Sequence, residues 1–143
     1  MRRVTPDEFR AAGHALIDWI ADERLAVRER RVLPDVQPGD VRAMLPTSPP
    51  TSTDTIDALL ADLARVVVPG MTAVQHPRHF GWFPSNASLA SVLGDLASSG
   101  LGGLGISWES NPALNEVEEE VCDWMRQLCG LSGAWRGTIQ HTA

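Results

Sequence analysis

Apolar residues recur at helical spacing in several stretches of the chain, and each stretch is bounded by helix start and stop signals. The first stretch, residues 6–30, follows Thr5-Pro6-Asp7-Glu8. This tetrapeptide combines an N-cap threonine, a proline at the first helical position and the glutamate of a capping box. A second helix is expected after Thr53 or Thr55, and Pro69-Gly70 is expected to end it.

The pattern predicts two more helices, over residues 87–99 and from Asn111-Pro112 to Gly130. The last one carries an acidic run, Glu116 and Glu118–Glu120, which we place near the helix start, where the dipole favours negative charge. A metal site is the alternative interpretation of that run. Cys122 and Cys129 lie about two turns, roughly 10 Å, apart on this helix, too far for a disulfide. We expect both to be buried small apolar residues.

The segments between these helices have a different character. Residues 32–53 hold five prolines and few large apolar groups, which predicts an extended linker with at most a short turn around 41–44. Residues 74–84 are rich in aromatics bracketed by prolines and are expected to be irregular. The final GTIQHTA is β-prone and is interpreted as a first strand whose partners are missing. The expected fold class is therefore mainly α, with one incipient strand.

Composition narrows the function classes. The formal net charge of −6 argues against a nucleic-acid partner, and Arg24, Arg28, Arg30 and Arg31 alternate with glutamates as on a solvated helix face. No apolar run reaches the ~18 residues of a membrane span, and MRRVTPDEF lacks the apolar core of a signal peptide, so a cytoplasmic protein is expected. The chain contains no lysine and no tyrosine, which excludes chemistry that needs a lysine Schiff base or a tyrosine proton donor from this polypeptide alone.

Two short motifs match known binding sites in spacing, but the segments around them do not fit those sites. Gly100, Gly102 and Gly105 have the spacing G-x-G-x-x-G, but a dinucleotide fingerprint needs a strand before the glycines and a helix directly on them. Here a helix is expected before them and Ile106-Ser107-Trp108 follows. His76 and His79 form an H-x-x-H, but on extended backbone these positions point apart, so no metal site is expected.

Apolar and aromatic residues gather on glycine-flanked irregular backbone in two short segments. They are Phe80, Trp82, Phe83 and Pro84 in the first and Leu104, Ile106 and Trp108 in the second. Plain hydrophobic core is one interpretation. The other is the wall of a pocket for a flat ligand.

Three motifs at these residues resemble the group II pyridoxal-phosphate-dependent decarboxylases, most closely the aromatic-L-amino-acid decarboxylases. They are H-P-x-x-F-x-x-F-P-S-N from His76, the G-x-G-I-S-W-x-x-x-P segment with its E-x-E helix, and the terminal G-x-I-Q-x-T-A. The opening D-E-F-R and I-D-W-I helix and the P-G-D-V-R linker are also similar, so the resemblance covers essentially the whole chain.

The resemblance implies the N-terminal helical flap plus the first helices and strand of an α/β enzyme of fold type I, which works as a homodimer on a small amino-acid substrate. Residues 1–80 would form a helical flap that dimerises, and 81–143 the incomplete start of the large cofactor-binding domain. The glycine-rich turn would let the backbone approach the partner subunit. The residues that the family motifs assign to substrate are Trp82, Phe83, Pro84, Ser85, Leu104 and Ile106, and those assigned to the phosphate of pyridoxal 5'-phosphate are Thr142 and Ala143.

The resemblance also implies what this polypeptide lacks. The family's Schiff-base lysine, ring-stacking histidine, ring-pairing aspartate and mobile-loop tyrosine would lie beyond residue 143, so no catalytic residue is expected within this chain and it should be inactive alone. Trp82 and Phe83 favour a flat aromatic side chain as substrate, such as that of tryptophan, phenylalanine or dihydroxyphenylalanine. The alternative function is a non-enzymatic helical module that dimerises or binds a partner.

Overall fold

The computed structural model describes residues 4–49, 51, 54–83 and 87–139. The described part of the chain is helical and contains no strand, which confirms the mainly-α expectation. It divides into two compact units, residues 1–89 and 90–143. The boundary expected at residue 80, and the roles assigned to either side of it, stay predictions.

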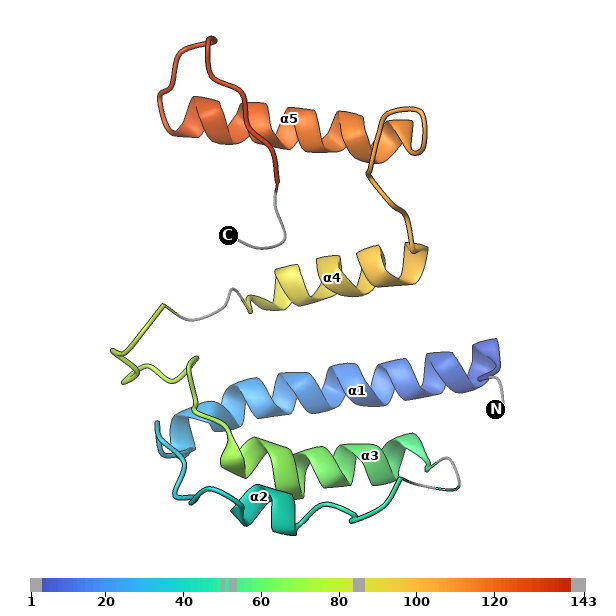
Figure 1. Ribbon diagram of the computed structural model, residues 1–143, viewed down its shortest axis with the longest axis vertical. Helices are drawn as coiled ribbons and strands as arrows, with labels where there is room; N and C mark the ends of the chain where they lie inside the picture. Colours follow the sequence, from blue (N-terminus) through green and yellow to red (C-terminus); the bar gives the residue numbers. More distant parts are fainter. Residues whose placement is uncertain (1–3, 50, 52–53, 84–86, 140–143) are drawn as a thin grey trace. The chain divides into compact units, whose positions relative to one another are not determined.

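The first unit is built on a long helix, α1 (Pro6–Ala26), which a 3₁₀ turn extends over Val27–Glu29. Its start has the predicted capping box: the Thr5 hydroxyl accepts a hydrogen bond from the Glu8 amide at 3.3 Å, and the Glu8 carboxylate accepts one from the Thr5 amide at 2.9 Å. α1 packs beside α3 (Ile56–Asp62), and the two helices run in the same direction (Figure 1).

The second predicted helix changes geometry along its length. Thr55 caps α3, the helix continues as a π-helical turn over Leu63–Val67, and a 3₁₀ turn over Val68–Gly70 ends it. Pro69 lacks the N–H that a further helical turn would need, so the predicted stop is confirmed.

The proline-rich linker crosses the surface of the first unit and contains one short helix, α2 (Asp40–Ala43), at the place where a turn was expected. Gly39 precedes it with φ = 105°, a conformation that a side chain would strain. Val41 lies so close to Gly70 that a Cβ on the glycine would come within 2.8 Å of a Val41 methyl carbon. The linker is therefore held against the end of the second helical stretch.

The basic cluster is divided between the helical stretch, which holds Arg24 and Arg28, and the segment after it. Arg30 and Arg31 lie beyond the helix, where Arg30 forms an ion pair with Glu23 and Arg31 lies 3.4 Å from Asp35. The helical hydrogen bonds end after Glu29, and Arg30 has an extended backbone, so the two arginines no longer lie on a helix face.

The second unit contains α4 (Leu89–Leu101) and α5 (Pro112–Leu128), which run in opposite directions (Figure 1). Asn111 caps α5 as predicted, its side chain accepting a hydrogen bond from the Leu114 amide at 3.3 Å. Residues 131–139 then turn back along α5 without forming a strand. Residues 137–139 of the expected strand are thus irregular, because no described strand offers them a hydrogen-bonded ladder, and 140–143 lie outside the described residues.

Little apolar surface is buried in either unit. Among the described residues, Val66 and Ala73 are the buried apolar side chains, exposed by 2% and 8%. Cys122 is half-buried and Cys129 exposed, so the expectation that both cysteines are buried is wrong, although both are free as expected.

Candidate functional site

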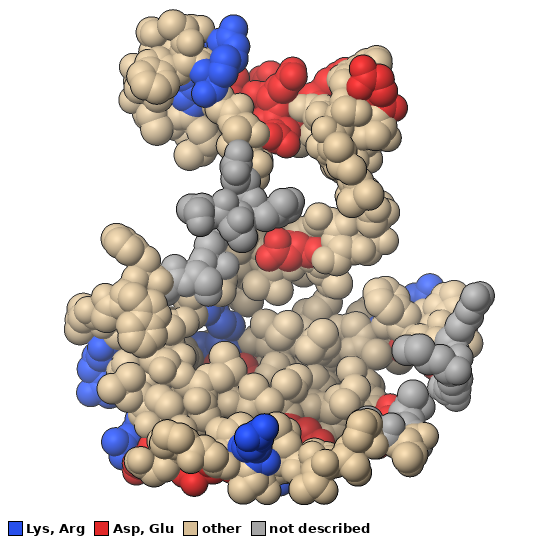
Figure 2. Space-filling model, viewed as in Figure 1, with Lys and Arg blue, Asp and Glu red and all other residues tan. Residues whose placement is uncertain are grey.

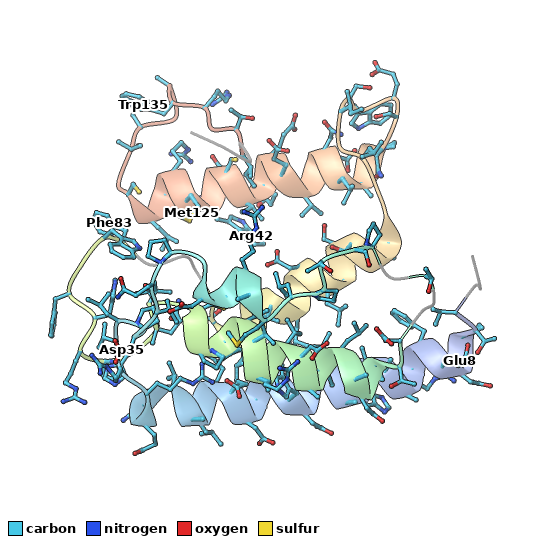
Figure 3. All side chains as sticks on the ribbon, turned by 60° about the horizontal axis from the view of Figure 1, so that its bottom comes forward. Glu8, Asp35, Arg42, Phe83, Met125 and Trp135 are labelled. Carbon is cyan, nitrogen blue, oxygen red and sulfur yellow. The ribbon has the colours of Figure 1, made fainter. Side chains whose placement is uncertain are left out.

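The aromatic segment of the first unit is irregular, as the sequence predicts, and its rings are uncovered. The exposed fractions are 90% for Phe80, 61% for Trp82 and 99% for Phe83. Figure 3 shows Phe83 on the loop between α3 and α4. The interpretation of these residues as plain core is therefore wrong for this chain, because no described element of the first unit covers them.

A buried histidine holds the start of this loop. His76 is 5% exposed, and its Nδ1 accepts a hydrogen bond from the Arg78 amide at 2.9 Å. Its Nε2 lies 3.1 Å from the carbonyl oxygen of Arg28, an atom that can only accept. The two partners therefore define a neutral ring with its proton on Nε2, which links the loop to the end of α1.

His79, the other histidine of the H-x-x-H, lies against Trp82. The two ring centroids are 5.1 Å apart at an interplanar angle of 78°, an edge-to-face arrangement. Gly81 lies between them, and a Cβ there would come within 3.1 Å of His79 Nε2. Gly81 thus allows the loop to turn tightly enough for the two rings to meet.

The second apolar segment, Leu104 and Ile106, lies in the loop between α4 and α5. These side chains are 68% and 80% exposed. Gly102, with φ = 61°, ends α4, and its amide donates to the Ser98 carbonyl at 3.1 Å. A Cβ on Gly103 would lie 2.9 Å from Leu114 Cδ1. The close approach that these glycines permit is to α5 of the same chain; an approach to a partner subunit stays a prediction.

A hydrogen-bonded turn connects Ile106 to α5. The Ser107 amide donates to the Ser110 hydroxyl at 3.1 Å, and the Ser110 hydroxyl donates to the Ser107 carbonyl at 2.8 Å. Hydrogen bonds from its own backbone and from Ser107 hold the pKa of Glu109 below its usual range. These hydrogen bonds, with that from the Asn111 amide to the Ser107 carbonyl at 3.0 Å, join the end of the apolar segment to the start of α5.

The acidic run of α5 has a different role from the expected one. No acidic residue lies in the first turn, and the helix dipole acts mainly there. The carboxylates instead accept hydrogen bonds: Glu116 from Trp108 Nε1 at 2.9 Å, and Glu120 from Trp124 Nε1 at 2.7 Å. Figure 2 shows acidic side chains gathered over this helix.

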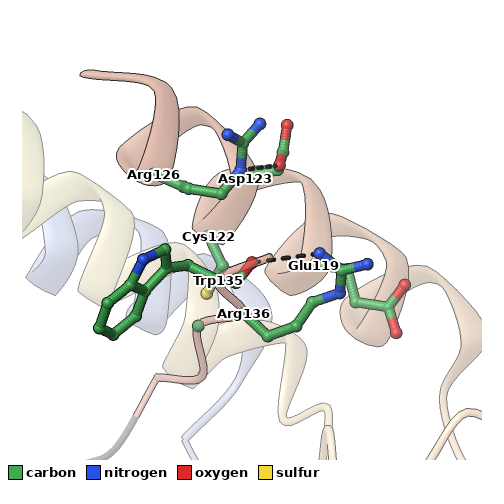
Figure 4. A pocket seen from close by; sticks show the side chains of 7 residues that line it. Glu119, Cys122, Asp123, Arg126, Trp135 and Arg136 are labelled. Atoms are coloured by element: carbon green, nitrogen blue, oxygen red, sulfur yellow. Dashed lines mark hydrogen bonds and ion pairs between the residues drawn. The ribbon is translucent and has the colours of Figure 1, made fainter. Parts of the chain in front are cut away.

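A hollow of about 410 Å³ lies between α5 and residues 135–137 (Figure 4). Arg126 borders it and donates to Asp123 at 2.7 Å. The hydrogen bond from Arg126, assisted by one from Gln127, lowers the pKa of Asp123, and the same contact raises the pKa of Arg126. The lining is charged and open, unlike the apolar pocket that a flat ligand needs.

Trp82 and Phe83 lie on the exposed loop of the first unit, and Leu104 and Ile106 lie in the exposed loop between α4 and α5 of the second. Pro84, Ser85, Thr142 and Ala143 lie outside the described residues. The assignment of all eight to a binding site stays a prediction. Sequence reasoning missed the structural role of His76, whose partner Arg28 is 48 residues away. It also missed the hydrogen bonds of Glu116, Glu118 and Glu120, whose partners are 8, 20 and 4 residues away.

Other site classes receive no support from the described residues. Within the described ranges, no group of three or more His, Cys, Asp or Glu side chains is placed to hold a metal ion. None of the helices in the part that the structure describes combines the length and apolar character that crossing a membrane requires.

Comparison with known proteins gives matches along the whole chain. Histidine decarboxylase of Homo sapiens is 40% identical over 128 residues, which are 90% of this chain and 19% of that protein. Aromatic-L-amino-acid decarboxylase of Bos taurus is 34% identical over 148 residues, 98% of this chain and 30% of that protein. The chain therefore spans less than a third of either relative.

A solved structure agrees closely in fold. Tryptophan decarboxylase of Catharanthus roseus, in complex with L-tryptophan, matches 100% of this chain and 32% of its own chain, with a TM-score of 0.91 and 33% sequence identity. Residues 38–143 also match the family model described as the pyridoxal-dependent decarboxylase conserved domain. As this model covers more than half of the chain, the chain belongs to the family of pyridoxal-dependent decarboxylases.

Proposed function

We propose that this chain is the N-terminal segment of a pyridoxal-phosphate-dependent carboxy-lyase that converts aromatic L-amino acids to amines and carbon dioxide. The observation that carries the proposal is the match to a tryptophan decarboxylase over the full length of this chain, with a TM-score of 0.91. Because the chain spans 32% of that protein, the activity is proposed for the complete protein and not for this segment alone.

In this proposal the segment supplies part of the substrate-pocket wall. Trp82 and Phe83, with Pro84 and Ser85, form one strip, and a second strip of Leu104 and Ile106 comes from the other subunit of a homodimer. The exposed fractions of 61% and 99% for Trp82 and Phe83 support this, since large apolar groups on a loop that is anchored by His76 need a covering partner or ligand.

The residues of this chain do not complete a cofactor site. The sequence has no lysine, so no side-chain amine is available to hold the aldehyde of pyridoxal phosphate covalently. Thr142 and Ala143, the proposed phosphate contacts, lie outside the described residues. We therefore assign no catalytic step to this segment and propose that it is inactive by itself.

The homodimer is proposed to form through the N-terminal helices. Phe9, Ile17 and Leu25 of α1 are 63%, 40% and 77% exposed, although the helix already packs on α3. Exposed apolar side chains along a 21-residue helix favour a further packing partner. A non-enzymatic helical interaction module is the second candidate, and the same exposed surface together with the lack of lysine favours it.

The test is to sequence the reading frame past Ala143, express the complete product and measure carbon dioxide release from tryptophan, phenylalanine, dihydroxyphenylalanine and histidine. We expect release from at least one aromatic substrate. An immediate stop codon, or a complete product that releases none, would favour the interaction module.

The pocket assignment has its own readout. In the complete protein, Trp82→Leu should lower kcat/KM for an aromatic substrate by about fivefold relative to a smaller one, because aromatic contacts are worth about 1 kcal/mol beyond the buried area. The ratio of kcat/KM for two substrates, measured on the same variant, does not depend on the fraction of the protein that is folded. An unchanged ratio would remove Trp82 from the pocket wall.

A further inference from the structure

The turn at the start of the aromatic loop fixes where the His79 ring lies. The His79 amide donates to the His76 carbonyl at 2.9 Å, and His76 itself is buried. On the other side, a Cβ on Gly81 would come within 3.1 Å of His79 Nε2 and 3.4 Å of His79 Cε1, so the ring lies over the bare backbone of the glycine. The backbone turn and this close contact therefore hold the imidazole at one place on the loop.

Packing holds the His79 ring, whereas hydrogen bonds hold the His76 ring. His79 Nε2 is buried and has no hydrogen-bond partner among the described residues, although both nitrogens of His76 have one. A buried nitrogen without a partner costs free energy, so packing has to offset that cost. The ring contact that the structure gives His79 is the edge-to-face pair with Trp82. In this loop His79 thus acts as an aromatic edge.

Trp82 differs from the other aromatic side chains of the loop in having this contact. Phe80 and Phe83 are exposed almost entirely, whereas Trp82 is partly covered. Side chains occupy discrete rotamers, and only a rotamer that faces His79 keeps the pair. An edge-to-face pair favours that rotamer about fivefold beyond the effect of the buried area. His79 therefore restricts the orientation of the indole, although more than half of the Trp82 surface is open.

We propose that His79 is a positioning residue that holds the Trp82 indole in one orientation and thereby sets the preference of the complete enzyme for flat aromatic side chains. The inference rests on the proposed function, because that function assigns Trp82 to the wall of the substrate pocket. His79 acts through Trp82 and not on the substrate. If the indole is free to turn, the apparent affinity falls in proportion to the population of the orientation that faces the substrate.

The first measurement uses the 143-residue chain and needs neither cofactor nor substrate. In NMR spectra the ring current of Trp82 should shift the ring protons of His79 away from those of the exposed His14. Trp82→Leu should return them to the His14 position. If Trp82→Leu leaves the ring protons of His79 where they were, the contact does not exist in solution and the inference is overturned.

The side-chain couplings of Trp82 report how many rotamers the indole occupies. His79→Phe keeps an aromatic edge and should preserve the couplings of a single rotamer, whereas His79→Leu removes the edge and should give averaged couplings. Gly81→Ala is a second variant that keeps both rings and displaces the imidazole. The φ of Gly81 is not positive, so alanine fits the backbone there. We expect averaged couplings in this variant as well.

The second measurement uses the complete protein and determines kcat and KM for tryptophan and for a smaller amino acid that the protein accepts. His79→Leu and Gly81→Ala should raise KM for tryptophan about fivefold relative to the smaller substrate and leave kcat unchanged. His79→Phe should keep the original ratio of KM values, and so should His14→Leu, the matched control on the exposed side of α1. Adding His79→Leu to Trp82→Leu should have little further effect, because both substitutions remove the same contact.

The outcomes separate the inference from the proposed function. If Trp82→Leu changes the preference for tryptophan and His79→Leu does not, the inference is overturned and the pocket assignment stands. If His79→Leu lowers kcat/KM for both substrates alike, His79 is only a structural residue and the inference is overturned. If Trp82→Leu leaves the preference unchanged, or the unchanged complete protein releases no carbon dioxide, the proposed function fails and the inference fails with it.

Discussion

Replacing His76 by phenylalanine tests whether a buried hydrogen-bonded ring holds the aromatic loop in place. Phenylalanine keeps the flat ring in a site where histidine is 5% exposed, but it removes both nitrogen atoms. The bonds to the Arg28 carbonyl and from the Arg78 amide are therefore lost together. The first bond joins the loop to the 3₁₀ turn after α1, and the second closes a turn within the loop, so their loss should release the loop that carries Trp82 and Phe83.

The magnitude follows from the surroundings of the two partners. Each hydrogen bond contributes about 1 kcal/mol net to stability. The loss is larger only if the remaining donor or acceptor stays buried and cannot bond to water. Arg28 and Arg78 are exposed residues, so their backbone groups can be hydrated once the loop opens. We therefore expect a loss of about 2 kcal/mol in the free energy of loop opening, or about 30-fold faster exchange of the Arg78 amide.

Amide hydrogen exchange by NMR measures this directly at Arg78 and Ala73. His14→Phe is the matched control, because His14 is exposed on α1 and the same substitution there removes no hydrogen bond that anchors the loop. If His76→Phe changes the Arg78 exchange rate less than about threefold, or no more than His14→Phe does, the ring does not anchor the loop.

Four further predictions follow from the other elements. Gly102→Ala should destabilise the second unit by about 1 kcal/mol, because the φ of Gly102 is 61°. Gly100→Ala should stabilise it by about 0.5 kcal/mol, because Gly100 lies in a helix with no atom near the new Cβ. Urea unfolding followed by circular dichroism measures both changes, and equal effects would contradict the role of backbone geometry. Arg126→Gln should raise the lowered pKa of Asp123 toward its usual range. Because the pKa is lower in the folded state, the contact stabilises the fold at neutral pH, and this stabilisation is lost as the pH falls through the folded-state pKa. An NMR titration of the Asp123 carboxyl in Arg126→Gln that shows no rise in pKa would refute this. The 143-residue chain should self-associate because of its exposed apolar surface, so a single monomeric species at all concentrations in sedimentation equilibrium would count against the proposal. Finally, borohydride reduction in the presence of pyridoxal phosphate should attach the cofactor to no internal residue of this chain, because it has no lysine, and peptide mapping by mass spectrometry that finds an internal adduct would refute the argument.

Helix starts and stops were predictable because their signals are local. The Thr5 capping box, the Asn111 cap and the Pro69-Gly70 stop each depend on residues within one turn of one another, and the structure confirms all three. The rejection of a dinucleotide fingerprint was equally local, since a helix and not a strand leads into the motif: Gly100 lies within α4 and Gly102 ends it. The family resemblance was also carried by short motifs, and the family model confirms it.

Burial and polar pairing were not predictable in the same way, because they depend on what the folded chain places beside a residue. Periodicity marked the apolar side of α5 but could not show that Cys129 is exposed. The acidic run looked like dipole compensation, yet its carboxylates accept hydrogen bonds from Trp108, Trp124 and the segment after α5. The candidate pocket residues were named from the family motifs alone, and their assembly into a site stays a prediction.

By itself the sequence determined which segments are helical, where the helices begin and end, and that the chain offers no lysine to a cofactor. Only the tertiary structure decided that His76 links the loop to α1 and that Glu118 holds residues 138 and 139, contacts that span 48 and about 20 residues. The physical reason is the range of the interactions. Caps and turns are closed by neighbours in the chain, whereas a hydrogen bond between distant segments exists only after packing has brought its donor and acceptor within about 3 Å.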